Sequence, residues 1–134
     1  MSNQKFGVLI PEERIRERIR EMGAQIREDH GDQTITAIGV LKGSFMFMAD
    51  LVRAIDGNVR CEFLGVSSYH GGTRSTGVVK ITKDLRHPIE GQHCIIVEDI
   101  IDTGLTMDYL VRMLEIRRPK SLKIVTLLDK PTHR

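Results

Sequence analysis

Apolar residues follow two different spacings along this chain, and the two spacings alternate. Three stretches place an apolar residue every three to four positions, which is typical of a helix with one buried face. These stretches are residues 11–29, residues 44–55 and a third that begins near Thr106 and ends before Pro119. Five shorter apolar runs, several of them rich in β-branched residues, predict strands. They lie at residues 34–41, 60–66, 78–81, 94–97 and 122–128.

Each predicted helix has an apolar stripe that defines the face we expect it to bury. The stripes are Ile15, Ile19, Met22 and Ile26 in the first helix, Phe45, Met48, Val52 and Ile55 in the second, and Met107, Leu110, Val111 and Leu114 in the third.

The order of these elements predicts an α/β fold. Strands that are separated by helices form a doubly wound parallel sheet with helices on both faces. We therefore expect a mainly parallel five-stranded sheet. The Gly-rich segment 69–77 predicts a flexible hairpin connection. Ligands of such a sheet bind at the carboxyl ends of the strands. The 134 residues have the length of a single domain.

Charge and cysteine content narrow the class of protein. The chain has 20 Lys and Arg against 18 Asp and Glu, a net charge of +2. We therefore expect neither a nucleic-acid nor a membrane partner. No apolar run approaches the ~20 residues of a membrane-spanning helix, and the N-terminus has no signal-peptide core. Cys61 and Cys94 lie in apolar runs, which predicts buried free thiols and a cytoplasmic location.

The segment 94–106, CIIVEDIIDTGLT, is the most informative part of the chain. A buried strand leads through two carboxylates, Glu98 and Asp99, into a turn at 102–106 and then a helix. The free N–H groups and positive dipole end of a helix N-terminus form an anion site. Carboxylates beside such a site suit a sugar phosphate, because they accept hydrogen bonds from ribose hydroxyls or face a cation carried by the ligand. The alternative is an ordinary buried strand followed by a polar turn.

The string VEDIIDTGLT resembles the phosphoribosyl pyrophosphate (PRPP) signature of type I phosphoribosyltransferases, in the form that hypoxanthine-guanine phosphoribosyltransferases carry. This resemblance extends from about Val8 to Arg134. It implies that Asp102 is the catalytic general base, and that Glu98 and Asp99 hold the ribose hydroxyls and, directly or through water, Mg²⁺. The residues that it implies for the 5′-phosphate are Thr103, Gly104, Leu105 and Thr106.

Two other segments gain a role from the resemblance. Lys42 and Gly43 follow a predicted strand and match the family's pyrophosphate loop, in which the peptide before the lysine is commonly cis. Without the resemblance, a solvated lysine in a turn is the simpler interpretation. Ser68 and Tyr69 match a lid that closes over pyrophosphate and excludes water.

Lys130 follows the last predicted strand and matches the family lysine that binds the exocyclic oxygen of a 6-oxopurine. An ammonium group only donates hydrogen bonds, so it selects a carbonyl oxygen over an amino group. The resemblance also implies an arginine near the pyrophosphate loop, at Arg134. A solvated lysine in an exposed loop is again the alternative.

The implied function is purine salvage. A phosphoribosyl group passes from PRPP to hypoxanthine or guanine, with Mg²⁺, and the products are pyrophosphate and a nucleoside monophosphate, IMP or GMP. The alternatives are a regulatory domain that binds PRPP or a nucleotide without catalysis, and a structural fragment of an oligomer. We expect a homodimer or homotetramer.

Members of this family continue into a C-terminal hood over the purine, and the sequence ends at Arg134 before that segment. We therefore expect the chain to bind PRPP or a 5′-nucleotide but to turn over purines more slowly than a chain with a hood.

Overall fold

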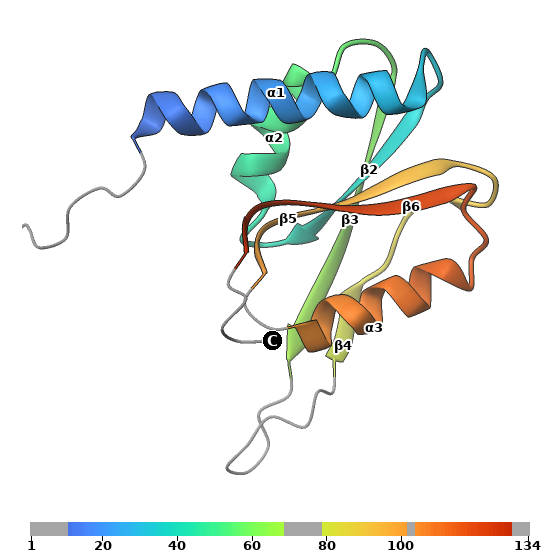
Figure 1. Ribbon diagram of the computed structural model, residues 1–134. Helices are drawn as coiled ribbons and strands as arrows, with labels where there is room; N and C mark the ends of the chain where they lie inside the picture. The colour runs from blue at the N-terminus through green and yellow to red at the C-terminus, as the bar shows by residue number, and fades with distance from the viewer. Residues whose placement is uncertain (1–10, 69–78, 102–103, 130–134) are drawn as a thin grey trace, which may run out of the picture.

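The computed structural model describes residues 11–68, 79–101 and 104–129 (Figure 1). Its helices are α1 (Glu12–His30), α2 (Phe45–Ala54) and α3 (Gly104–Glu115). Its strands are β2 (Ile35–Leu41), β3 (Val59–Ser68), β4 (Val79–Lys83), β5 (His93–Ile101) and β6 (Ser121–Asp129).

The five strands form one sheet in the order β4-β3-β2-β5-β6. Strand β2 pairs in parallel with both β3 and β5, and β5 pairs in parallel with β6. Only the β3–β4 pair is antiparallel among these. The predicted mainly parallel, five-stranded α/β sheet is therefore confirmed, while the predicted lid at its hairpin connection lies outside the described residues.

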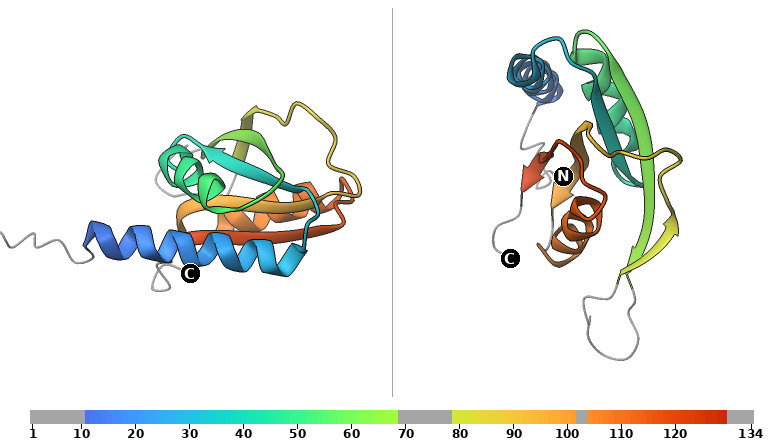
Figure 2. Two further views of the ribbon diagram at one scale, coloured as in Figure 1. Left: turned by 90° about the horizontal axis from the view of Figure 1, so that it is seen from above. Right: turned by 90° about the vertical axis from the view of Figure 1, so that its right-hand side faces the viewer.

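Helices cover both faces of the sheet. Figure 1 shows α1 and α2 on one side and α3 on the other, and the two turned views in Figure 2 agree. Strand β2 alternates between them, since Ile35 and Ala37 pack in the core under α1 and α2, whereas Ile38 and Val40 pack in the core under α3. A strand that is buried on both faces reads as a continuous apolar run, which is why β2 was readable from the sequence.

The apolar stripe predicted for α2 is partly wrong. Phe45 is 56% exposed, and Phe47, Met48 and Leu51 are the buried residues of this helix. The run Phe45-Met46-Phe47-Met48 contains four consecutive apolar residues, so their spacing alone does not fix which of them faces the sheet. Contact with the sheet buries Phe47 and Met48 and leaves Phe45 and Met46 in solvent.

The two cysteines differ in their surroundings. Cys94 is buried in β5, as predicted, and burial raises its pKa to about 11. The prediction that Cys61 is buried is wrong, because it lies near the beginning of β3 and lines an open groove with Thr36 and Arg60. Both thiols are free.

Candidate active site at the carboxyl ends of β2 and β5

The carboxyl ends of the central strands bring two of the predicted segments to one edge of the sheet. Gly39 of β2 lies beside Val97 of β5, and each strand then continues toward the same edge. Strand β2 ends two residues later at Leu41, directly before Lys42, and β5 continues through Glu98 and Asp99. These strand ends and that of β6 meet at the left of Figure 1.

Strand β5 is longer than the sequence predicted. It ends at Ile101 rather than near Val97, and α3 already begins at Gly104. The carboxylates of Glu98 and Asp99 therefore belong to the strand itself, because β6 continues to pair with β5 through Ile101. Only two residues separate the strand from the helix.

The first turn of α3 contains Gly104, Leu105 and Thr106. The first four N–H groups of an α-helix have no partner within the helix, so this turn presents donors at the sheet edge. Gly104, the first helical residue, adds no side chain to the space in front of these groups. Thr106 is half-buried. This arrangement is the strand, turn and helix N-terminus that the sequence predicted.

Glu98 lies in register beside Thr126 of β6. Its side chain is half-buried. Strand alternation places Glu98 on the same face as Ile96, which packs in the core under α3. Glu98 thus lies beside β6, on the face of the sheet that α3 covers.

The second turn follows β2. The peptide bond between Leu41 and Lys42 is cis, as the family resemblance implies. Lys42 and Gly43 are both exposed, and α2 begins at Phe45. An exposed ammonium group beside the start of a helix can bind an anion that approaches this edge.

Ser44 is a residue of this turn whose role the sequence did not reveal. It is fully buried, and its hydroxyl donates to the carbonyl oxygen of Val40 at 2.5 Å. A serine before a helix predicts a capping bond to the helix, yet Ser44 makes no such bond. Its hydroxyl instead closes the turn around Lys42 and leaves the first amides of α2 without a side-chain cap.

The remaining predicted site residues are not placed. Asp102, Thr103, Tyr69, Lys130 and Arg134 lie outside the described residues. Ser68, Asp99 and Leu105 belong to regular elements, but their side chains are likewise not described.

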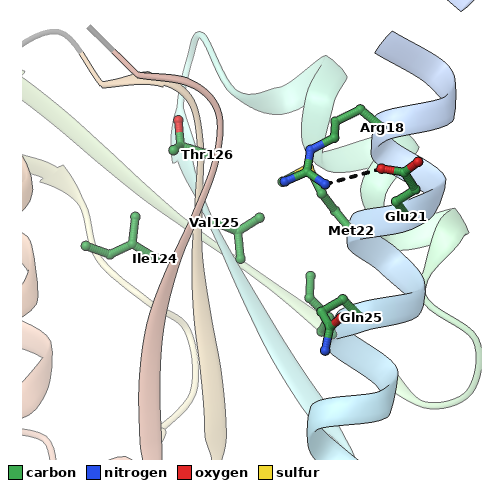
Figure 3. A pocket seen from close by; sticks show the side chains of 8 residues that line it. Arg18, Glu21, Met22, Gln25, Ile124, Val125 and Thr126 are labelled. Carbon is green, nitrogen blue, oxygen red and sulfur yellow. Dashed lines mark hydrogen bonds and ion pairs between the residues drawn. The ribbon is translucent and has the colours of Figure 1, made fainter. Parts of the chain in front are cut away.

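The groove in Figure 3 lies between α1 and β6 and extends to Thr126, the residue that pairs in register with Glu98. It has a volume of about 580 Å³ and is lined by Met22, Ile26, Val125 and their neighbours. Arg18 and Glu21, both on α1, pair at 3.3 Å on one side of the groove. None of the predicted site residues lines it.

The described residues include no group of three or more His, Cys, Asp or Glu side chains that could hold a metal ion. A metal site built wholly from protein ligands is therefore not present in that part of the chain. Within the same part, no helix is long and apolar enough to cross a membrane.

The doubly wound sheet has two helix N-termini at one edge, the arrangement in which α/β proteins bind ligands at the carboxyl ends of their strands. Residues 11–134 match the phosphoribosyl transferase domain. The chain therefore belongs to the phosphoribosyl transferase family.

Within this family the chain is similar to hypoxanthine-guanine phosphoribosyltransferases. It is 51% identical to that of Bacillus subtilis and 50% identical to that of Staphylococcus epidermidis, in each case over 127 residues. Both alignments cover 95% of this chain and 71% of the relative. The crystal structure of a hypoxanthine phosphoribosyltransferase from Staphylococcus aureus superposes with a TM-score of 0.90 at 48% identity, covering 95% of this chain and 69% of that one.

Proposed function

We propose that this chain transfers a phosphoribosyl group from PRPP to hypoxanthine or guanine in purine salvage, giving IMP or GMP and pyrophosphate. The observation that carries this proposal is the identity of about half of the residues with hypoxanthine-guanine phosphoribosyltransferases. A regulatory domain without catalysis is not favoured, because these relatives are named as enzymes. One domain, formed around the single sheet, carries the reaction.

The phosphate end of the ligand binds at the beginning of α3. The N–H groups of the first turn and the positive end of the helix dipole attract the 5′-phosphate. Thr103 and Thr106 add hydroxyl donors, while Gly104 and Leu105 contribute backbone N–H groups. Glu98 and Asp99 accept hydrogen bonds from the ribose hydroxyls. The half-buried position of Glu98 on β5 supports this role, because a carboxylate held there faces a ligand seated on the turn.

The leaving group binds at the end of β2. Negative charge grows on pyrophosphate as its bond to C1 of the ribose breaks, and a nearby cation stabilises that charge. Lys42 is exposed at the same edge as β5, and Gly43 beside it leaves room for the ligand. Ser68 and Tyr69 close over the pyrophosphate and exclude water.

Mg²⁺ fits the carboxylates of this edge. It is usually bound in proteins by one or two carboxylates together with phosphate oxygens of the substrate and water. Successive residues of β5 alternate between the faces of the sheet, so Glu98 or Asp99, directly or through water, would hold the ion together with PRPP oxygens. An ion held there would supply positive charge that stabilises the departing pyrophosphate.

The purine end is bound and activated by two residues. Asp102 takes the proton from N7 of the base during transfer and returns it in the reverse reaction. Lys130 donates to the exocyclic oxygen of the base, which admits hypoxanthine and guanine and rejects adenine.

We also propose that the protein forms a homodimer or homotetramer in the cytoplasm. The apolar side chains of Phe45 and Met46 are 56% and 66% exposed at the beginning of α2, where a second subunit would cover them. The free thiols of Cys61 and Cys94 suit a reducing compartment.

Isotope exchange tests the proposed function. The protein is incubated with PRPP, Mg²⁺ and labelled pyrophosphate, with and without hypoxanthine, and PRPP binding is followed in parallel by calorimetry. We expect label to enter PRPP when hypoxanthine is present. Binding without exchange would instead support the regulatory alternative, and absence of both would reject the site.

Lys130→Ala should weaken purine binding and leave PRPP binding nearly unchanged.

A further inference from the structure

His30 is a buried histidine at the end of the fold opposite the candidate active site. It is the last residue of α1 and only 7% exposed. Its Nδ1 lies 2.8 Å from the carbonyl oxygen of Ile26. A carbonyl oxygen only accepts, so Nδ1 carries the hydrogen and the neutral ring has a bare acceptor at Nε2. That Nε2 is buried and has no hydrogen-bond partner.

His93 faces this ring from the first position of β5. The centroids of the two imidazole rings are 5.1 Å apart, and the ring planes meet at 71°. The Nδ1 atom of His93 lies 2.7 Å from the hydroxyl of Ser121, the first residue of β6. The pair therefore joins the end of α1 to the beginnings of β5 and β6, which lie together at the right of Figure 1.

The charges around the pair are mostly positive. Lys120 and Lys123 lie close enough to act on His93 electrostatically, as does His30. The carboxylate of Asp29 is 3.8 Å from the ammonium group of Lys123, so that acid is already engaged by a cation. A proton added to His93 therefore meets two cations and a neighbouring imidazole. A proton on His30 would place a new N–H donor at a buried position without an acceptor.

We propose that the His30–His93 pair is an acid-sensitive latch, which holds the C-terminal end of α1 against β5 and β6 and releases it when His93 takes up a proton. This latch does not depend on the proposed function, because it lies at the amino ends of β5 and β6, whereas the candidate site lies at the carboxyl ends of the strands.

The pH range follows from His93. Burial lowers its pKa below the ordinary value of 6.5, and His30, Lys120 and Lys123 lower it further. The folded chain therefore binds fewer protons at this ring than the unfolded chain does. The latch therefore contributes its full stabilisation above pH 6.5. This stabilisation is lost as the pH falls through the lower pKa of His93 in the folded state.

The test compares the loss of melting temperature between about pH 7.5 and about pH 5.5 in four proteins. They are the parent chain, His30→Phe, His93→Gln and, as a control at an exposed position outside the pair, Glu90→Gln. His30→Phe keeps a buried ring but cannot be protonated, and His93→Gln keeps a polar group opposite Ser121. Over this pH range, we expect the melting temperatures of His30→Phe and His93→Gln to fall by less than half as much as that of the parent. The melting temperature of the control should fall nearly as much as that of the parent.

A second readout separates the latch from general destabilisation. The titration midpoint of His93, followed by NMR, should rise in His30→Phe because one of its unfavourable neighbours is gone. If His30→Phe does not fold, His93→Gln carries the comparison of melting temperatures. An undiminished pH-dependent loss in the pair variants, or an unchanged His93 midpoint in His30→Phe, would overturn the latch.

Discussion

Glu62 is a buried carboxylate that holds the connection between β4 and β5 in place. It is 8% exposed and accepts hydrogen bonds from the backbone N–H of Arg86 at 2.9 Å and from Nδ1 of His87 at 2.7 Å. Burial acts to raise its pKa, but the two hydrogen bonds and the charges of His87 and Lys83 outweigh burial and bring the pKa below 4.5. The ionised form is therefore the one that the fold stabilises.

The pH dependence that follows from Glu62 has a definite sign. Because the pKa of Glu62 is lowered in the folded state, Glu62 contributes fully to the free energy of unfolding above pH 4.5. This contribution is lost as the pH falls through the folded pKa. We expect Glu62→Gln to lower the free energy of unfolding by about 1–3 kcal/mol at neutral pH. Its stability should also fall less steeply than that of the parent below about pH 5, measured by urea denaturation. Glu90→Gln, at an exposed position in the same connection, is the control. If the stability of the parent and of Glu62→Gln fell equally with pH, the stabilising role of ionised Glu62 would be refuted.

Arg27 joins the end of α1 to the loop that precedes β3. Its guanidinium group donates to the carbonyl oxygens of Gly31 at 2.9 Å, Gln33 at 2.7 Å and Asn58 at 3.2 Å, and to that of Asp56. Arg27→Ala leaves these four acceptors to solvent, and we expect it to lower the free energy of unfolding by about 2 kcal/mol. Arg20→Ala, an exposed change in the same helix, should cost far less. Similar losses in the two variants, by chemical denaturation, would show that Arg27 is an ordinary surface arginine.

At the scale of elements, α1 and α2 approach closely at Gly23. A Cβ atom built there would lie 2.5 Å from the carbonyl oxygen of Ala54 and 2.7 Å from its Cβ. Alanine favours helix over glycine by about 1 kcal/mol, so Gly23→Ala would stabilise a helix without this contact. We instead expect a net loss of about 1–3 kcal/mol from overpacking. The exposed Ala24→Gly reports the propensity effect alone, and a melting temperature raised by Gly23→Ala would disprove the close contact.

The first turn of α3 carries the prediction for ligand binding. Gly104 is its first residue, and a β-branched side chain there would occupy the space of the proposed phosphate site. Gly104→Val should abolish binding of a 5′-mononucleotide in calorimetry while the melting temperature changes little. Binding as tight as that of the parent would mean that the phosphate lies elsewhere.

The elements themselves were largely predictable from local patterns. Helix α1 and strand β2 have regular apolar spacing, and both match the expected ranges within one residue at each end. Strands β3 and β5 extend further than their apolar runs, because backbone pairing continues into polar residues such as Ser67 and Glu98. The orientation of α2 was not predictable, since its apolar run gives no unique stripe.

For the molecule as a whole, the mainly parallel five-stranded sheet and the expectation of a site at the carboxyl ends of its strands followed from strand and helix alternation, whereas the strand order did not. Nor did the contacts between distant residues. Arg27 and Asn58, Glu62 and His87, and His30 and His93 are each brought together by the folded sheet and its connections. The local spacing of residues in the sequence does not predict such contacts. For the candidate site, the sequence indicated Lys42 and Glu98 at strand ends but did not reveal how Ser44 closes the turn after β2.

We propose that the edge formed by β2 and β5 catalyses phosphoribosyl transfer to a 6-oxopurine. The most direct measurement is the formation of nucleoside monophosphate from PRPP and Mg²⁺ with hypoxanthine, guanine or adenine, in the parent chain and in Asp102→Ala. We predict IMP and GMP with the first two bases, no AMP, and a large loss of product in the variant. Efficient use of adenine, or equal product from the parent and Asp102→Ala, would contradict the account.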